Sequence, residues 1–515
     1  MRKLLYSVFL LSAIFIASCK KDNKFTPGVD GPSKEGSTLD LIKDSIYLYA
    51  QQTYYWNDLL PTYAKFHPRA YNGSTDLEAL SNEVDALTQQ TVNPETGKAY
   101  EYYEDAPGYA KYSFIDDGST SGELNGEQKD FGFAPAYETD EDLRVKYVYP
   151  GSPADVKGIK RGYQITAING RSGSGLEYDK GGPNVKFIVN AYAYSKSITM
   201  TLKKPDGSKF DATLSASNYQ KNPVLVSKVI EANGKKVGYI AFNSFVSLEL
   251  AQAPLLAAFN TFKSENISSL VVDLRYNGGG EVETAEYLTN LIAPSTVNGT
   301  VMFKMYFNET MANGKATILK NQPFTFQGKH YTMFDYSFKS DDNVSLFSKS
   351  GLPNLSLNNV FFIVTGSTAS ASELTINNLI PVSGLNVKLI GTTSYGKPVG
   401  FFPLKINKYE LYVPQFETKN SLIQGGYYTG MKPGSSKYPG KEAADDLTKD
   451  FGDPSELLLS YALNYVNKGT FEESGPRVQS LAAGQTFSAD ESREAGIKMD
   501  GNKFKGMILK NLKPN

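Results

Sequence analysis

The sequence predicts a multidomain α/β protein, because its 515 residues fall into three stretches of different texture. Residues 37–115 carry apolar side chains at helical spacing, and residues 128–216 form short β-like runs broken by Gly and Pro. Residues 217–467 alternate buried strands with helices, which is typical of α/β layers. A single hydrophobic core rarely extends over so long a chain. We therefore expect an N-terminal helical unit, a β-rich domain and an α/β core, in that order.

Charge and cysteine content exclude several kinds of partner and cofactor. The chain has 53 Lys and Arg against 54 Asp and Glu and no long basic run, so we expect no nucleic-acid partner. Cys19 is the sole cysteine, which makes an intrachain disulfide impossible. No Cys/His cluster indicates a metal site, and we expect neither a metal nor a cofactor.

The first residues, "MRKLLYSVFLLSAIFIASC", place two basic residues ahead of a short apolar run and then small residues, as export signals do. The run is too short to span a bilayer. "IASC" resembles the lipobox of bacterial lipoproteins, and this implies a signal peptide over 1–18 and a lipid on Cys19. Residues 19–36 then form a polar tether, and the protein is expected in the bacterial cell envelope, anchored to the membrane. An ordinary signal peptide that contains a cysteine is the alternative.

Two helices are expected in the N-terminal unit. Apolar residues recur at three- and four-residue spacing from Ile42 to Leu60, and Pro61 ends the run. A second helix opens at Thr75, which has the capping-box spacing to Glu78. We interpret this unit as a packing or spacer domain.

A segment of the β-rich stretch, "VYPGSPADVKGIKRGYQITAING", resembles the heart of a PDZ domain, which binds polypeptide termini as an added strand. The resemblance implies that "FGFA" is the carboxylate-binding loop, with Phe131, Gly132 and Phe133 as substrate-binding residues. Tyr163 stands where the family usually has Asp, a change that concerns ligand preference more than the fold.

The α/β stretch contains two strand, tight turn, helix units. "SLVVDLR" leads into "YNGGG" and a helical run, and "VFFIVT" leads into "TGSTASASELTINNL". A tight turn that opens a helix leaves backbone N–H groups without partners, and such groups can stabilise an oxyanion. Both turns are therefore candidates for parts of an active site.

The serine-rich turn raises the question of a nucleophile. Ser370 and Glu373 have capping-box spacing, so Ser370 could simply cap its helix. A nucleophile needs a base, and the two histidines, His67 and His330, lie in poor surroundings for a Ser/His/Asp triad. Lys397 in "SYGKPVGFF" follows a strand and lies among apolar residues, which would lower its pKa and let it accept a proton. The alternative for Lys397 is a solvated surface charge.

Together "GSTASASE", the downstream "GKP", the upstream "DLRYNGGG" and the preceding PDZ-like segment resemble the C-terminal processing, or tail-specific, protease family over residues 37–467. This resemblance implies a core fold of the ClpP/crotonase type and substrates with accessible C-termini. It also implies Ser370 as nucleophile, Lys397 as general base, and an oxyanion hole formed by Gly279 and Ala371.

Two departures from the family pattern are visible. Many members carry Gln four residues after the lysine, where this chain has Phe401, so Ser394, Tyr395 or a backbone carbonyl must position Lys397. The separation of Ser370 from Lys397 is also slightly long, which predicts a rebuilt loop at "NLIPVSGLNV". A catalytically silent peptide-binding lipoprotein and an acyl-thioester enzyme of the crotonase type remain as alternatives. Residues 468–515 carry no motif and are expected to be a strap or a loose tail.

Overall fold

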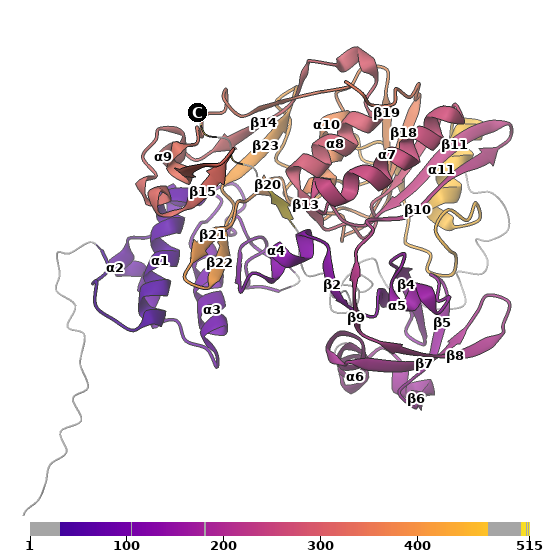
Figure 1. Ribbon diagram of the computed structural model, residues 1–515, viewed down its shortest axis with the longest axis horizontal. Coiled ribbons are helices and arrows are strands. Elements are labelled where there is room, and N and C mark those ends of the chain that lie inside the picture. Colours follow the sequence, from indigo (N-terminus) through magenta and orange to yellow (C-terminus); the bar gives the residue numbers. More distant parts are fainter. Residues whose placement is uncertain are drawn as a thin grey trace, which may run out of the picture.

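The computed structural model describes residues 31–104, 106–179, 182–471, 506–510, 512 and 514. Figure 1 shows an α/β core, a β-rich domain below it on the right, and a helical unit below it on the left. The predicted α/β class is therefore confirmed. No helix in these described ranges is long and apolar enough to cross a membrane.

A six-stranded sheet forms the centre of the core, in the order β10-β11-β12-β18-β19-β24. Strands from β11 to β24 run parallel, and β10 pairs antiparallel with β11. The bounds are β10 (Val224–Ala232), β11 (Lys235–Phe242), β12 (Ser269–Asp273), β18 (Asn359–Val364), β19 (Asn386–Gly391) and β24 (Gly440–Glu442). The two strands that the sequence analysis quoted, "SLVVDLR" and "VFFIVT", are thus β12 and β18.

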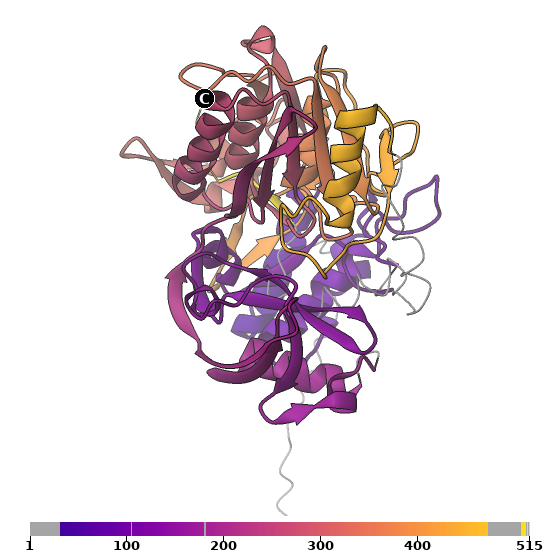
Figure 2. The ribbon, with the colours of Figure 1, turned by 90° about the vertical axis from the view of Figure 1, so that its right-hand side faces the viewer.

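Helices cover both faces of this sheet (Figure 2). Successive strand side chains point to opposite faces, so Val271 packs in one apolar cluster with α11, and Val272 in another with α7, α8 and α10. The helix bounds are α7 (Leu248–Ser264), α8 (Val282–Ile292), α10 (Ala371–Leu379) and α11 (Leu457–Lys468). Two hydrophobic layers therefore hold the two strand-turn-helix units in place.

The β-rich domain is a sheet of order β3-β4-β5-β7-β8, with β6 paired to β5, and two short helices. Its elements are β3 (Phe133–Thr139), β4 (Asp142–Val148), α5 (Pro153–Val156), β5 (Gln164–Ile168), β6 (Arg171–Ser172), α6 (Pro183–Val189), β7 (Ser197–Lys203) and β8 (Lys209–Ser215). A two-stranded ribbon of β2 (Glu127–Asp130) and β9 (Ser217–Gln220) links this domain to the core.

Smaller sheets extend the core toward the helical unit. One has the order β17-β14-β23-β20, another has the order β1-β22-β21, and β15 pairs with β16. Their bounds are β1 (Phe114–Asp116), β14 (Val301–Phe307), β15 (Pro323–Phe326), β16 (Lys329–Thr332), β17 (Val344–Leu346), β20 (Val399–Gly400), β21 (Leu404–Ile406), β22 (Tyr409–Tyr412) and β23 (Phe416–Asn420). Strands β13 (Gly279–Glu281) and β25 (Gly506–Ile508) pair with each other.

The N-terminal unit shares one hydrophobic cluster with the core, because Ile46 and Leu80 pack in the same cluster as Phe401 and Tyr412. Its helices are α1 (Thr38–Thr53), α2 (Tyr63–Phe66) and α3 (Asp76–Thr88), and α9 (Glu309–Ala312) of the core lies beside them. Helix α4 (Ser119–Leu124) follows this unit in the chain and precedes β2. The N-terminal unit and the core therefore share one hydrophobic core at this place.

The first helix ends earlier than the sequence indicated. Periodicity predicted a helix as far as Pro61, but α1 ends at Thr53 and Tyr54 is extended. Tyr54 is fully buried, its ring packs edge-on against Trp56, and its hydroxyl donates to Glu101 Oε1 at 2.8 Å. Tertiary packing of these aromatic rings overrides the helical periodicity. The second helix begins where it was predicted, with Thr75 as its cap.

Candidate active site

Ser370 lies in the turn between β18 and α10 and has an unusual backbone. Its φ of 56° and ψ of −103° fall in a region that residues other than glycine avoid, at a cost of about 1–3 kcal/mol. The side chain is fully buried, and its hydroxyl lies 3.5 Å from the Val399 carbonyl oxygen. Such strain persists where surrounding contacts fix it, and it concentrates at functional sites. The strained backbone therefore marks Ser370 as a candidate for a functional role.

The serine turn and the glycine-rich turn are joined by hydrogen bonds. The Asn277 carbonyl oxygen accepts from the Ala369 N–H and from the Ser372 hydroxyl, both at 3.0 Å. The Thr368 hydroxyl donates to the Leu274 carbonyl oxygen at 2.7 Å. Because β12 and β18 are parallel neighbours, both turns emerge at the same edge of the sheet.

The two predicted oxyanion-hole residues meet at this edge. Gly279 has a φ of 106°, and a Cβ added to it would lie 3.1 Å from the Ala371 nitrogen. Ala371 is the first residue of α10, where backbone N–H groups have no intrahelical acceptor. The Gly279 N–H, in contrast, donates to Asn277 Oδ1 at 2.9 Å. In this arrangement Ala371 offers its N–H group, while that of Gly279 is engaged by Asn277.

Lys397 is buried beside the serine turn. Its Nζ donates to the Tyr112 carbonyl oxygen at 3.4 Å and lies 3.8 Å from the centroid of the Phe401 ring. Burial disfavours the charged ammonium, whereas the carbonyl and the ring favour it. Phe401 is the residue that the sequence analysis found in place of the Gln of the tail-specific protease family. Its ring faces the Lys397 ammonium. The solvated alternative for Lys397 is wrong.

The helical unit closes the lysine end of the site. The Tyr112 hydroxyl donates to the Gly396 carbonyl oxygen, and the Tyr395 hydroxyl donates to the Lys111 carbonyl oxygen, both at 2.7 Å. Lys111 Nζ donates to the Tyr428 carbonyl oxygen at 2.9 Å. Residues 111–112 therefore exclude water from Lys397, a contribution that no local sequence pattern indicated.

Glu373 connects the nucleophile candidate to the base candidate. Its carboxylate accepts from the Ser370 N–H and the Lys397 N–H, each at 2.8 Å. It also accepts from the Gly396 N–H at 2.7 Å and from the Ser394 hydroxyl at 2.5 Å. Burial raises the pKa of the Glu373 carboxyl, although these four donors act against that effect. One buried side chain thus fixes the backbone of both candidate residues.

We expect Glu373→Gln to impair turnover more than substrate binding. A carboxamide replaces one acceptor oxygen with an NH₂ group that faces N–H donors, so the backbone of Ser370 or Lys397 must shift. We expect kcat to fall about tenfold or more with a smaller change in KM, because a small misplacement of reacting groups slows the chemical step. Steady-state kinetics on a peptide substrate checks this. Glu249→Gln, at an exposed position of α7, is the matched control and should leave both constants unchanged.

The predicted carboxylate-binding loop is buried in the β-rich domain. Phe131 and Phe133 are almost fully buried, and Gly132 has a φ of 79°. The Gly132 N–H donates to Asp130 Oδ1 at 2.8 Å, and the Phe133 ring packs edge-on against Tyr192. In this conformation the Gly132 donor is satisfied within the chain.

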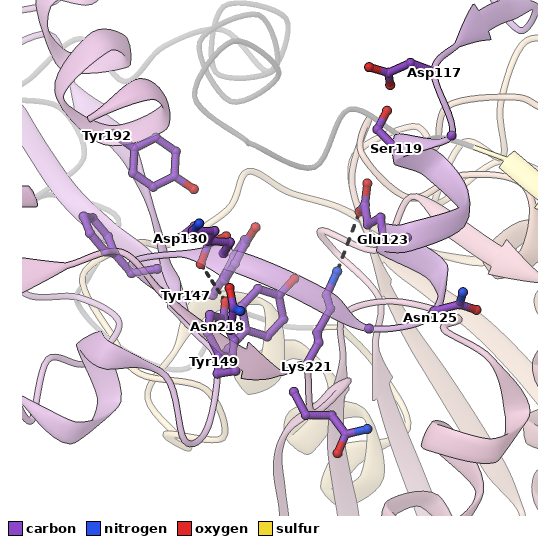
Figure 3. A pocket seen from close by; sticks show the side chains of 17 residues that line it. Asp117, Ser119, Glu123, Asn125, Asp130, Tyr147, Tyr149, Tyr192, Asn218 and Lys221 are labelled. Atoms are coloured by element: carbon purple, nitrogen blue, oxygen red, sulfur yellow. Dashed lines mark hydrogen bonds and ion pairs between the residues drawn. The ribbon is translucent and has the colours of Figure 1, made fainter. Parts of the chain in front are cut away.

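A cavity of about 960 Å³ adjoins this loop and extends to α4. Phe133 and Tyr192 line one side, and Figure 3 shows Glu123 of α4 and Lys221 on the other. Lys221 is buried, and its Nζ lies 3.7 Å from Glu123 Oε1. Burial acts to lower the pKa of Lys221, but Tyr149 and Glu123 outweigh burial and raise it. The cavity wall therefore carries charges of both signs, since Asp117, Glu123 and Asp130 line it together with Lys129 and Lys221.

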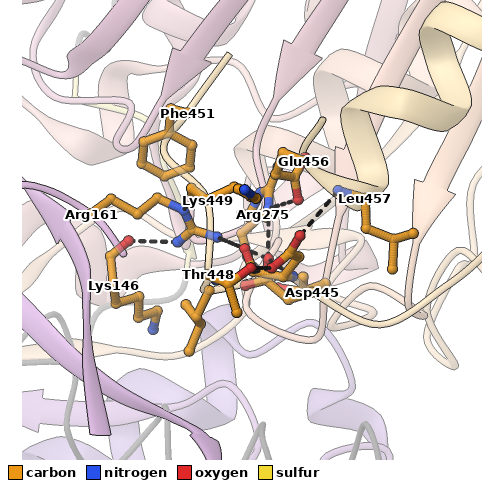
Figure 4. Close-up of polar contacts among 12 residues, drawn as sticks. Lys146, Arg161, Arg275, Asp445, Thr448, Lys449, Phe451, Glu456 and Leu457 are labelled. Atoms are coloured by element: carbon orange, nitrogen blue, oxygen red, sulfur yellow. Dashed lines mark hydrogen bonds and ion pairs between the residues drawn. The ribbon is translucent and has the colours of Figure 1, made fainter. Parts of the chain in front are cut away.

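A buried ionic network joins the β-rich domain to the glycine-rich turn (Figure 4). Arg275, two residues before Asn277, pairs with Asp273 at 2.7 Å, with Asp445 at 2.6 Å and with Glu456 at 2.8 Å. Arg161 of the β-rich domain pairs with the same Asp445 at 3.0 Å. One carboxylate thus links the two domains through two arginines.

The remaining predicted residues lie elsewhere. His67 ends α2 and His330 is exposed in β16, and neither contributes to the cluster around Ser370. Cys19 lies outside the described residues. No group of three or more His, Cys, Asp or Glu residues in the described ranges is arranged to hold a metal ion.

Comparison with known proteins identifies two domains. The profile of peptidase family S41 matches residues 236–421, and the profile of the PDZ domain matches residues 121–191. A carboxyl-terminal-processing protease of Picosynechococcus sp. is 27% identical over 212 residues, which is 40% of this chain and 49% of that protein. Carboxyl-terminal-processing peptidase 3, chloroplastic, of Arabidopsis thaliana is 25% identical over 149 residues, or 27% of each protein.

The chain thus spans about half the length, or less, of these curated relatives. Among solved structures, one described as an S41 protease from Bacteroides fragilis aligns with a TM-score of 0.56 and 22% identity. The alignment covers 85% of this chain and 99% of that one, and at this identity it shows a shared fold.

Proposed function

The chain belongs to the C-terminal processing protease family of S41 peptidases with a PDZ domain, and from this premise we propose that it is a serine endopeptidase with a Ser370/Lys397 dyad. Its substrates are polypeptides with accessible C-termini, which the PDZ domain captures.

The observation that carries the proposal is the Glu373 carboxylate, which binds the backbone N–H groups of both Ser370 and Lys397. A helix cap alone would require only the contact with Ser370. The additional contacts at 394–397 bring a distant lysine to the serine turn. This arrangement is what a nucleophile and its base require.

In the proposed mechanism, Ser370 Oγ attacks the peptide carbonyl carbon while the neutral form of Lys397 takes the hydroxyl proton at Nζ. The Ala371 N–H stabilises the oxyanion, and the Gly279 N–H joins it once it leaves Asn277 Oδ1. Collapse of the intermediate breaks the C–N bond, and Lys397 returns the proton to the leaving amine. Water, deprotonated by the same lysine, then hydrolyses the acyl-enzyme and restores Ser370.

We further propose that the cavity beside Phe133 receives the C-terminal part of a substrate. Lys221 lies 3.7 Å from Glu123 in this structure, and in the proposal a terminal carboxylate of the substrate takes the place of Glu123 beside it. A lipid on Cys19 would hold the enzyme in the bacterial cell envelope, close to envelope polypeptides. This localisation rests on the sequence of residues 1–19.

Cleavage of an unfolded polypeptide tests the proposed activity. Residues 20–515 are incubated with a disordered polypeptide that ends in small apolar residues, and the fragments are identified by mass spectrometry. The proposal predicts new termini at internal bonds. Binding of the polypeptide without cleavage would instead favour a catalytically silent peptide-binding protein.

Amidation of the substrate C-terminus tests tail recognition. Loss of one charge-assisted contact is worth about 1.5–3 kcal/mol, so we expect kcat/KM to fall roughly tenfold or more, mainly through KM. Competition kinetics with the two forms of one peptide measures the ratio. Lys221→Met should remove the preference for the free carboxylate, and equal cleavage of both forms by the unmodified enzyme would contradict tail recognition.

A further inference from the structure

A distant segment of the chain is inserted as a strand beside the active site. Strand β25 lies parallel to β13, with Gly506 opposite Gly279, and its Gly506 N–H donates to the Gly278 carbonyl oxygen at 3.0 Å. On its other side the Phe401 N–H donates to the Met507 carbonyl oxygen at 2.9 Å, and the Leu509 N–H donates to the Phe401 carbonyl oxygen at 2.8 Å. Residues 506–509 thus fill a slot between the glycine-rich turn and the strand that follows Lys397.

This slot adjoins the reacting groups. A Cβ added to Gly279 would lie 2.2 Å from the Gly506 carbonyl oxygen and 3.1 Å from the Ala371 nitrogen. The Gly506 carbonyl oxygen and the Ala371 nitrogen therefore both lie close to Gly279. Ile508 packs in one apolar cluster with Ala369. The inserted segment consequently touches the surroundings of the nucleophile.

The side-chain contacts of residues 507–510 indicate which residue types the slot accepts. Met507, Ile508 and Leu509 are 0%, 2% and 8% exposed, so three consecutive apolar side chains are accommodated. Lys510 Nζ then pairs with the buried Glu281 carboxylate at 2.7 Å and donates to Asn125 Oδ1 at 2.9 Å. Asn125 also lines the cavity that reaches the PDZ domain. The slot therefore accepts an extended segment with a small residue, three apolar residues and a basic residue.

We propose that this slot is where a substrate strand binds, and that residues 506–510 occupy it as an internal ligand that inhibits the enzyme. This inference rests on the proposed protease function. Proteins bind extended peptides by pairing their backbone with the edge of a strand, and here the segment pairs on both of its edges. A substrate must displace the internal strand, and substrates that carry the same pattern compete best.

The test compares the chain that ends at residue 505 with the full chain on one peptide substrate. We expect truncation to raise kcat/KM at least tenfold, because the competing strand is removed. A synthetic peptide of residues 506–515 should then inhibit the truncated enzyme competitively. Lys510→Glu in the full chain, which repels Glu281, should raise kcat/KM in part, whereas Lys263→Glu at an exposed position of α7 should not.

The outcomes separate this inference from the proposed function. If the full chain cleaves and the truncated chain is folded but no faster, the strand is a structural element and the inference is overturned. If truncation unfolds the chain, kcat/KM of the full-length Lys510→Glu variant is the test. A value equal to or below that of the unmodified chain overturns the inference.

If neither chain cleaves, the protease function fails, and binding of the labelled 506–515 peptide to the truncated chain is measured by fluorescence anisotropy. Absence of saturable binding then overturns the slot as well. Binding that Glu281→Gln weakens supports it as a strand-binding site.

Discussion

Lys397→Met is expected to lower kcat/KM by roughly 10⁴-fold, and Ser370→Ala by a similar factor, because each removes one half of a unit that transfers a single proton. The two changes combined should be no worse than either alone, since members of a catalytic unit are strongly non-additive. Initial rates with a fluorogenic peptide measure all three variants. Met fills the volume of the buried lysine stem, so the melting temperature should not fall.

Lys349→Met is the matched control for this prediction. Lys349 is also buried, its Nζ donates to the Asn290 carbonyl oxygen at the end of α8, and burial lowers its pKa to about 8. It lies outside the site, and its replacement should leave kcat/KM within about twofold of the unmodified enzyme. A comparable loss of activity in both lysine variants would mean that the Lys397 effect is structural and would contradict the proposed base.

Arg275→Met is expected to lower the free energy of unfolding by about 3–5 kcal/mol, the largest stability effect that we predict. The Arg275 side chain is 1% exposed and pairs with three carboxylates, so its removal leaves buried negative charge without compensation. Because Asn277 follows two residues later and accepts from the serine turn, activity should fall as well. Urea unfolding followed by circular dichroism measures the change.

The same network predicts a dependence on pH. Burial acts to raise the pKa of Asp445, but Arg161 and Arg275 outweigh it and hold the pKa well below its usual range. The folded chain therefore binds this proton less readily than the unfolded chain, and stability falls as the pH drops below about 4. The difference between Arg275→Met and the unmodified protein should narrow at acid pH, where the carboxylates become protonated.

Lys236→Met is the control for the network. Lys236 pairs with Glu265 at 2.6 Å, but both side chains are more than 40% exposed, and such pairs contribute little. Its urea midpoint should match that of the unmodified protein. If Arg275→Met and Lys236→Met lowered the free energy of unfolding equally, the buried network would stabilise the fold no more than an exposed ion pair does.

Local patterns were sufficient to predict most elements of the core and to single out Ser370 and Lys397 as candidate residues. Strands β12 and β18 are continuous apolar runs, and each is followed by a small-residue turn and a helix, so their positions follow from residue type. The apolar neighbours of Lys397 in the sequence also predicted its buried environment. The sequence did not predict that α1 ends at Thr53, because this end depends on aromatic packing around Tyr54 and Trp56.

Contacts between distant residues account for what the sequence did not reveal. Ser-x-x-Glu spacing indicated that Glu373 belongs to a helix cap, but its contacts with residues 394–397 arise only when β18 and β19 pair. Tyr112 likewise reaches Lys397 from another unit of the chain. The segment 506–510 has too short an apolar run to indicate a strand, and the partners that make it one lie near residues 280 and 401.

Formation of an acyl-enzyme on Ser370 is the most direct test of the Ser370/Lys397 dyad. The truncated chain that ends at residue 505 would be mixed with an activated peptide ester, quenched in acid within the first turnover, and mapped by mass spectrometry after digestion. We predict an acyl adduct on the peptide that contains Ser370, strongly reduced in Lys397→Met and absent in Ser370→Ala. An adduct on another residue, or turnover of the ester without dependence on Ser370, would contradict the assignment.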